Sequence, residues 1–278
     1  MLDQALRARV LVASDPRDLW IAGQLDTVDP WAQVAALGQA RTRAPNEKLF
    51  VASLAMACSQ SLQPLPADCD ATDRLADWAI RDADNGVPVL LLADRARRRN
   101  NPEAMLAFLE EAVTRPRFDD YRDRGVVLLW EALSALPGTS EPAARAELAA
   151  AYGARQSYAA QQIEAMCRGE QRFSDSIRLA CSTAGSAAAQ RAASWPLRVA
   201  GARLAERTAA AGAAQTNAQT QLTNVQRRAF DCADAITQSS QSLESADASV
   251  RARAVSQWEA RLARQAQVGE VAACEIKS

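Results

Sequence analysis

The chain has 278 residues, enough for one large domain or two small ones, and its formal net charge of −1 provides no overall basic field for nucleic acid. Only two of the 32 basic residues are lysines, and there is no histidine. The missing histidine excludes Ser–His and Cys–His catalysis and His-containing zinc sites.

The composition predicts an all-α protein. Hydrophobic residues make up 49% of the chain, and many of them are alanine, which has the highest intrinsic helix propensity. Several helix starts are marked by a capping side chain before a first-turn proline. The clearest are Asp15-Pro16, Asn101-Pro102 and Asp29-Pro30. No alternating β pattern with hairpin turns is present.

Two acidic stretches each allow a structural and a metal-binding interpretation. In "ADCDATD", residues 67–73, Asp70 and Asp73 fit a capping box at a helix start, although a metal site would also use such carboxylates. In "DADNGVPVLLLA", residues 82–93, the spacing faintly resembles a calcium loop. Its glycine comes one residue early and its twelfth residue is Ala93, so we expect an interhelix turn capped by Asp84 or Asn85.

An apolar pattern recurs every 38 residues in the first half of the chain. The matching positions are Val51, Leu54, Ala55 and Cys58, then Val89, Leu92, Ala93 and Ala96, and more weakly Val127, Trp130, Glu131 and Ser134. A fixed period of this size is typical of stacked helical hairpins.

Residues 89–116 resemble a degenerate tetratricopeptide repeat. Val89-x2-Leu92-Ala93-x2-Ala96 stands where the first helix of that motif reads W-x2-L-G-x2-Y. Ala104-x3-Phe108 and Pro116 match its second helix, but both aromatic positions of the first helix are absent and the turn is one residue short. The resemblance covers about residues 46–137 and implies an α-solenoid whose concave face binds protein segments. A plain helical bundle would explain much of the same pattern.

The stretch "RPRFDDYRDR", residues 115–124, contains the candidate partner-binding residues Arg117, Phe118 and Tyr121. Arginine and tyrosine are enriched in interface hot spots. The alternative is an interhelix loop whose two aromatic rings anchor into the core. The preceding "RARRR", residues 95–99, suits a helix C-terminus and lacks the interleaved aromatics of a nucleic-acid site.

The break "LPGTSEP", residues 136–142, divides the chain into a tetratricopeptide-like region, 1–138, and an Ala-rich helical region, 139–278. In the second region we expect a long helix ending near Cys167 and a second helix that carries Cys181. The run 208–221 has few bulky side chains and is either a linker or an exposed helix segment.

The six cysteines predict a disulfide framework. None forms a CxxC pair, and their spacing favours the local pairs Cys58–Cys69, Cys167–Cys181 and Cys232–Cys274, although six cysteines allow 15 pairings. Disulfides indicate a periplasmic or secreted protein, whereas six buried free thiols would fit the cytoplasm. The N-terminus as given lacks the pattern of a signal peptide, so we expect that one was removed before residue 1, that the start is misassigned, or that the chain is cytosolic. No apolar stretch is long enough to span a membrane.

This layout resembles uncharacterised helical-repeat proteins of the bacterial cell envelope. We therefore expect a non-catalytic module that binds a protein or peptide, with no cofactor, no metal and no nucleic acid. One alternative is an inhibitor or immunity protein for a secreted toxin. Another is a helical cell-wall lytic enzyme that uses a single glutamate.

Overall fold

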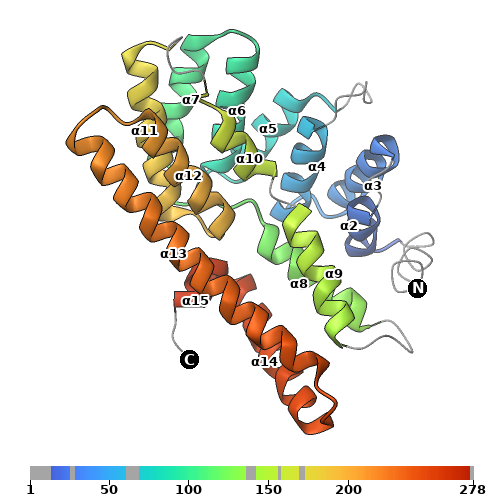
Figure 1. Cartoon of the computed structure of the whole chain (residues 1–278). Coiled ribbons are helices and arrows are strands. Elements are labelled where there is room, and N and C mark those ends of the chain that lie inside the picture. The colour runs from blue at the N-terminus through green and yellow to red at the C-terminus, as the bar shows by residue number, and fades with distance from the viewer. Residues whose placement is uncertain are drawn as a thin grey trace. The chain divides into compact units, whose positions relative to one another are not determined.

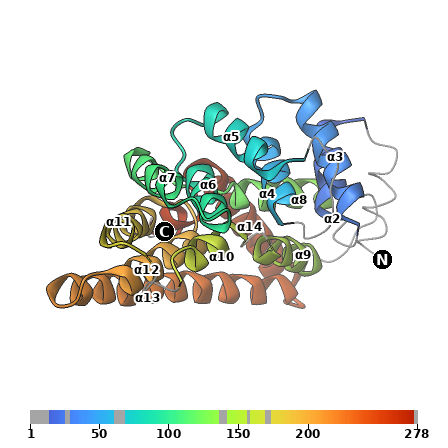
Figure 2. The same ribbon diagram turned by 90° about the horizontal axis from the view of Figure 1, so that it is seen from above.

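The computed structural model describes residues 14–25, 29–60, 69–135, 142–155, 158–168 and 173–275. These residues form helices joined by turns, and no β-strand occurs among them (Figures 1 and 2). The all-α prediction is therefore confirmed. No helix in the described part of the chain is long and apolar enough to cross a membrane.

The helices group into two compact units that are interleaved along the sequence. Unit 1 is built from Met1–Arg74, Tyr121–Gln156 and Asp234–Val268, and unit 2 from Leu75–Asp120, Ser157–Ala233 and Gly269–Ser278. Each unit thus takes segments from both sides of residue 138. The predicted boundary at 138/139 lies outside the described residues and stays a prediction.

Unit 1 has a core built around Trp20. Its elements are α2 (Pro16–Leu25), α3 (Pro30–Arg43), α4 (Lys48–Gln60), α8 (Arg122–Ser134), α9 (Pro142–Arg155), the short η2 (Ser242–Glu244) and α14 (Ala248–Val268). The buried Trp20 ring stacks on Phe50 and meets the edge of Tyr152, and its Nε1 donates to Ser53 Oγ at 2.8 Å. The polar atom of the buried Trp20 ring therefore has a hydrogen-bond partner.

Unit 2 is built on two helical hairpins and two shorter helices. Its elements are α6 (Val87–Arg98), α7 (Pro102–Thr114), α10 (Tyr158–Ala165), α11 (Asp175–Arg191), α12 (Trp195–Thr208) and α15 (Glu270–Glu275). Helix α11 packs on both α12 and α7 (Figure 1). Two further helices belong to both units: α5 (Ala71–Arg81) begins in unit 1, and α13 (Ala213–Gln241) begins in unit 2.

Two glycines bring α11 and α12 into close contact. A Cβ added at Gly201 would lie 2.7 Å from the backbone nitrogen of Ala189 and 2.7 Å from the carbonyl oxygen of Gly185. A Cβ at Gly185 would in turn meet the backbone nitrogen of Ala205 at 2.6 Å. The two backbones therefore touch here, and only glycine fits at either position.

The predicted helix caps are present where the sequence marked them. Asp29 accepts hydrogen bonds from the backbone nitrogens of the first turn of α3, and Asn101 accepts from Ala104 N at 3.0 Å. Asp70 Oδ1 accepts from Thr72 N at 2.7 Å, as expected for a capping side chain. One or two of the first-turn N–H groups that lack intrahelical partners are thereby satisfied in each helix.

Ser194 at the start of α12 behaves differently from a capping serine. It occupies the N-cap position, but its hydroxyl makes no cap hydrogen bond. Instead, the buried carboxylate of Glu270 accepts from Trp195 N at 3.1 Å. A residue 75 positions away therefore stabilises this helix end, and it also fixes the C-terminal segment of unit 2.

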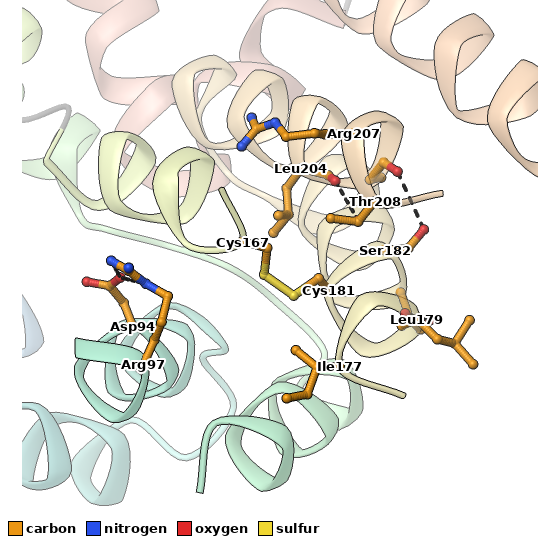
Figure 3. Close-up of a disulfide and its surroundings, with 12 residues drawn as sticks. Asp94, Arg97, Cys167, Ile177, Leu179, Cys181, Ser182, Leu204, Arg207 and Thr208 are labelled. Atoms are coloured by element: carbon orange, nitrogen blue, oxygen red, sulfur yellow. Dashed lines mark hydrogen bonds and ion pairs between the residues drawn. A yellow bond between two sulfur atoms is a disulfide. The ribbon is translucent and has the colours of Figure 1, made fainter. Parts of the chain in front are cut away.

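Three disulfides connect the predicted local pairs, Cys58–Cys69, Cys167–Cys181 and Cys232–Cys274. The Cα–Cα distances are 5.4, 6.6 and 5.8 Å, within the range that disulfides occupy. The pairing prediction is confirmed. Figure 3 shows the Cys167–Cys181 bond joining the end of the α10 segment to α11, with Ile177 on the same helix and Leu179 pointing away from it.

We expect the unreduced protein, once denatured, to contain no thiol that iodoacetamide can alkylate. After reduction, its intact mass should rise by the six hydrogens of three broken disulfides. Replacing Cys167 and Cys181 together by alanine should lower the free energy of unfolding by about 3 kcal/mol, because their bond closes a short loop in the unfolded chain. Urea denaturation checks the second value, and six alkylated thiols without reductant would contradict the framework.

Candidate functional site

The "DADNG" stretch is a buried structural turn. Asn85 is fully buried, and its Nδ2 donates to Asp82 Oδ2 at 2.8 Å and to the carbonyl oxygen of Asp119 at 2.6 Å. Its Oδ1 accepts from the backbone nitrogens of Val87 and Asp119. Asn85 thus uses its full hydrogen-bonding capacity within the protein. The stretch therefore forms the expected interhelix turn, and it is Asn85, not Asp84, that bonds to the first turn of α6.

The described part of the chain contains no group of three or more acidic or cysteine side chains placed to hold a metal ion. At the 67–73 stretch, Asp70 is turned toward the backbone N–H groups of α5. A carboxylate in that arrangement stabilises the helix start.

Of the three candidate partner-binding residues, two are buried. Phe118 has no exposed surface, and its ring lies against Gly86, where an added Cβ would overlap it. Tyr121 is buried in unit 1, and Arg117 pairs with the buried carboxylate of Asp82. Both rings are thus anchored in the core. A role of these residues in partner binding stays a prediction, and the site described below does not use them.

The segment of Arg117 and Phe118 is also held through its backbone. Gly86 N donates to the carbonyl oxygen of Arg117, and Ala193 N donates to that of Phe118, each at 2.8 Å. Two isolated parallel bridges accompany these bonds. The segment therefore acts as an internal tie between the ends of α6 and α11 in unit 2.

The "RARRR" cluster surrounds a buried carboxylate. Asp94, almost fully buried on α6, accepts from Arg97 at 2.8 Å and from Arg98 at 2.7 Å. Nearby Tyr158 is partly withdrawn from water, and this burial raises the pKa of its phenol. The arginines therefore serve first to neutralise Asp94, because an unpaired buried charge would be costly.

Unit 1 contains a pocket of about 440 Å³, a size typical of ligand-binding sites. Residues of α3 form one side of the pocket, and Leu54 of α4, Cys69 and Arg74 of α5 complete it. Among the residues that the structure describes, the lining consists of Val34, Ala35, Gly38, Gln39, Arg41, Thr42, Arg43, Leu54, Cys69 and Arg74. Figures 1 and 2 show where α3 and α4 lie in unit 1.

The pocket has an apolar floor. Val34, Leu54 and Cys69 are all buried among its lining residues. Gly38 is one of the α3 residues of the lining, and a Cβ added there would meet no atom within 4 Å. The glycine is therefore not required by packing, and the space in front of it is open.

Most of the other lining residues are polar or cationic. Three of the ten lining residues are arginines, Arg41, Arg43 and Arg74, and none of the ten is acidic. The Cys58–Cys69 disulfide fixes one edge, since Cys69 is itself a lining residue. Arg43 donates through Nη1 to the carbonyl oxygen of Ser14, which holds its stem in place.

An exposed tryptophan stands on the same face of α3. Trp31 is 50% exposed, an unusual state for the largest aromatic side chain. Positions 31, 35, 38 and 42 are separated by three or four residues and so form one stripe along the helix. The rise of 1.5 Å per residue places Trp31 about 10 Å along the axis from Gly38.

Sequence reasoning did not single out these pocket residues. The stripe of Trp31, Ala35, Gly38 and Thr42 is visible in the sequence once α3 is placed. The signal is weak, because a tryptophan on a helix is usually a core residue, as Trp20 and Trp78 are here. The contribution of Leu54, Cys69 and Arg74 depends on helix packing.

Comparison of the chain with protein-family models, with curated proteins and with solved structures found no match in any of the three.

Proposed function

We propose that this chain is a non-catalytic protein-interaction module, and that the α3 pocket of unit 1 receives a segment of its partner. The observation that supports this most directly is a pocket that combines an apolar floor with three lining arginines, beside which α3 also carries the exposed Trp31. Tryptophan and arginine are the residue types most enriched in interface hot spots. A concave site that unites both is suited to a protein ligand.

We further propose that the module works in the bacterial periplasm or at the cell envelope. Three disulfides are compatible with an oxidising compartment. The tetratricopeptide-like character of residues 46–137 is part of the same proposal. In its support, α6 and α7 form a helical hairpin with Asn101 as the cap of the second helix, and the three recurring apolar patterns fall on α4, α6 and α8.

Filling the pocket should strongly reduce partner capture. A photo-crosslinking residue at the exposed lining position Gln39 should capture a protein from envelope extract of the source organism. The added substitution Gly38→Trp should reduce capture about tenfold or more, because its ring occupies the open space in front of α3. Gly38→Ala should leave capture intact, since a methyl group leaves most of the pocket empty. Quantitative mass spectrometry of the captured proteins gives the readout.

The crosslinker placed instead at exposed Glu259 on α14, which does not line the pocket, controls for non-specific capture. The same proteins captured at both positions, or capture unchanged by Gly38→Trp, would contradict the proposal.

A further inference from the structure

We infer that the α3 pocket selects a partner segment in which an Asp or Glu side chain lies next to an aliphatic residue. This inference rests on the proposed function and adds the chemistry of the ligand. It follows from the two halves of the pocket lining, one cationic and one apolar, and from the length of the α3 stripe.

The cationic half favours a carboxylate. A guanidinium carries five N–H donors in a planar fork, so an arginine that makes one internal hydrogen bond can still bind an external carboxylate through two others. Arg43 illustrates this, because its bond to Ser14 uses a single Nη. Among the lining residues that the structure describes, the only charged side chains are arginines.

The apolar half favours an aliphatic neighbour. Val34, Leu54 and Cys69 present carbon and sulfur atoms at the floor, where a charged group would lose its hydration without gaining a partner. An aliphatic side chain inserted there would remove apolar surface from water on both sides. A ligand with charge alone would leave this half of the pocket unused.

The Trp31 stripe favours a protein segment over a small carboxylate. The stripe extends about 10 Å beyond Gly38, roughly three residues of an extended chain. A small dicarboxylate occupies the arginine end only, whereas an extended segment also covers the exposed Trp31 ring. A small ligand would leave the 50% exposed indole ring of Trp31 uncovered.

A library of random octapeptides tests the inference on the full-length protein. Each octapeptide is displayed with both of its ends joined to the carrier protein, so that no free terminal carboxylate takes part in binding. Selection on the wild-type protein, with depletion on the Gly38→Trp variant, should enrich Asp or Glu adjacent to Leu, Ile or Val. A synthetic enriched peptide with blocked termini should bind in fluorescence anisotropy, and replacing its acidic residue by the corresponding amide should weaken binding about tenfold or more. Raising the NaCl concentration from about 0.05 to 0.5 M should also weaken it.

We expect Arg41→Gln and Arg74→Gln each to weaken binding of the acidic peptide and to leave binding of its amide version unchanged. The peptide comparison needs no altered protein, so it decides the matter even if an arginine variant unfolds. Three results would each overturn the inference. The first is enrichment of neutral or basic peptides, and the second is no enrichment relative to the Gly38→Trp variant. The third is displacement of the bound peptide by succinate at a concentration equal to that of the peptide. If extract capture still depends on Gly38 in such a case, the interaction function stands and only the ligand chemistry is wrong.

Discussion

Gly201→Ala is expected to lower the free energy of unfolding by about 2–3 kcal/mol, although alanine is the better helix former. The added methyl group would lie 2.7 Å from two backbone atoms of α11, at Ala189 and Gly185. Backbone atoms cannot rotate away as a side-chain end can, so α11 and α12 would have to separate. The separation would expose the buried face of unit 2. Urea denaturation followed by circular dichroism measures the change.

Gly38→Ala is the matched control, because both glycines lie inside helices and differ in their surroundings. At Gly38 an added Cβ meets nothing within 4 Å, so we expect a gain in stability of about 0.5–1 kcal/mol. The two substitutions should therefore have opposite signs. A stabilising Gly201→Ala would mean that the helices are not in backbone contact.

Asn85→Ala is expected to destabilise the protein by about 3 kcal/mol or more. The substitution removes four hydrogen bonds from a fully buried site. It leaves the backbone N–H groups of Val87 and Asp119 and the carbonyl oxygen of Asp119 without this partner, and buried polar groups that lose partners carry a desolvation cost. The measurement is again the free energy of unfolding in urea.

Asn101→Ala provides the comparison within the same unit. It removes one cap hydrogen bond, to Ala104 N at an exposed helix start, and should cost only about 1 kcal/mol. Equal losses for the two variants would show that Asn85 is no more than an ordinary cap. A loss at Asn85 several times larger would identify the 82–87 turn as the polar centre of unit 2.

The helix starts and the cysteine pairs could be predicted because their causes are local. Asp29 and Asn101 cap helices through bonds to residues two or three positions away, and any chain with that sequence can form them. Cys58 and Cys69 are separated by only 11 residues, so proximity in sequence already favours the bond. Local logic does not extend to the start of α12, where the distant Glu270 bonds to Trp195 N and the N-cap residue Ser194 makes no side-chain cap bond.

The Ala-rich region shows a second kind of error. The sequence predicts one long helix ending near Cys167, whereas the structure has α9 in unit 1 and α10 in unit 2. Alanine favours helix everywhere in this stretch and so carries little information about where a helix ends. The assignment of the two parts to different units depends on which apolar surfaces they bury.

By itself the sequence determined the all-α class, the main helix starts, the disulfide pairs and the exclusion of histidine chemistry, because composition and short-range bonding decide each of these. Only the tertiary structure decided that Phe118 and Tyr121 are core residues and that Trp31 is exposed. It also decided which residues line the α3 pocket, where Leu54, Cys69 and Arg74 join the lining residues of α3 across gaps of 11 (43 to 54) to 40 (34 to 74) residues. Such contacts depend on how helices pack, and the spacing of residues within one helix does not specify its neighbours.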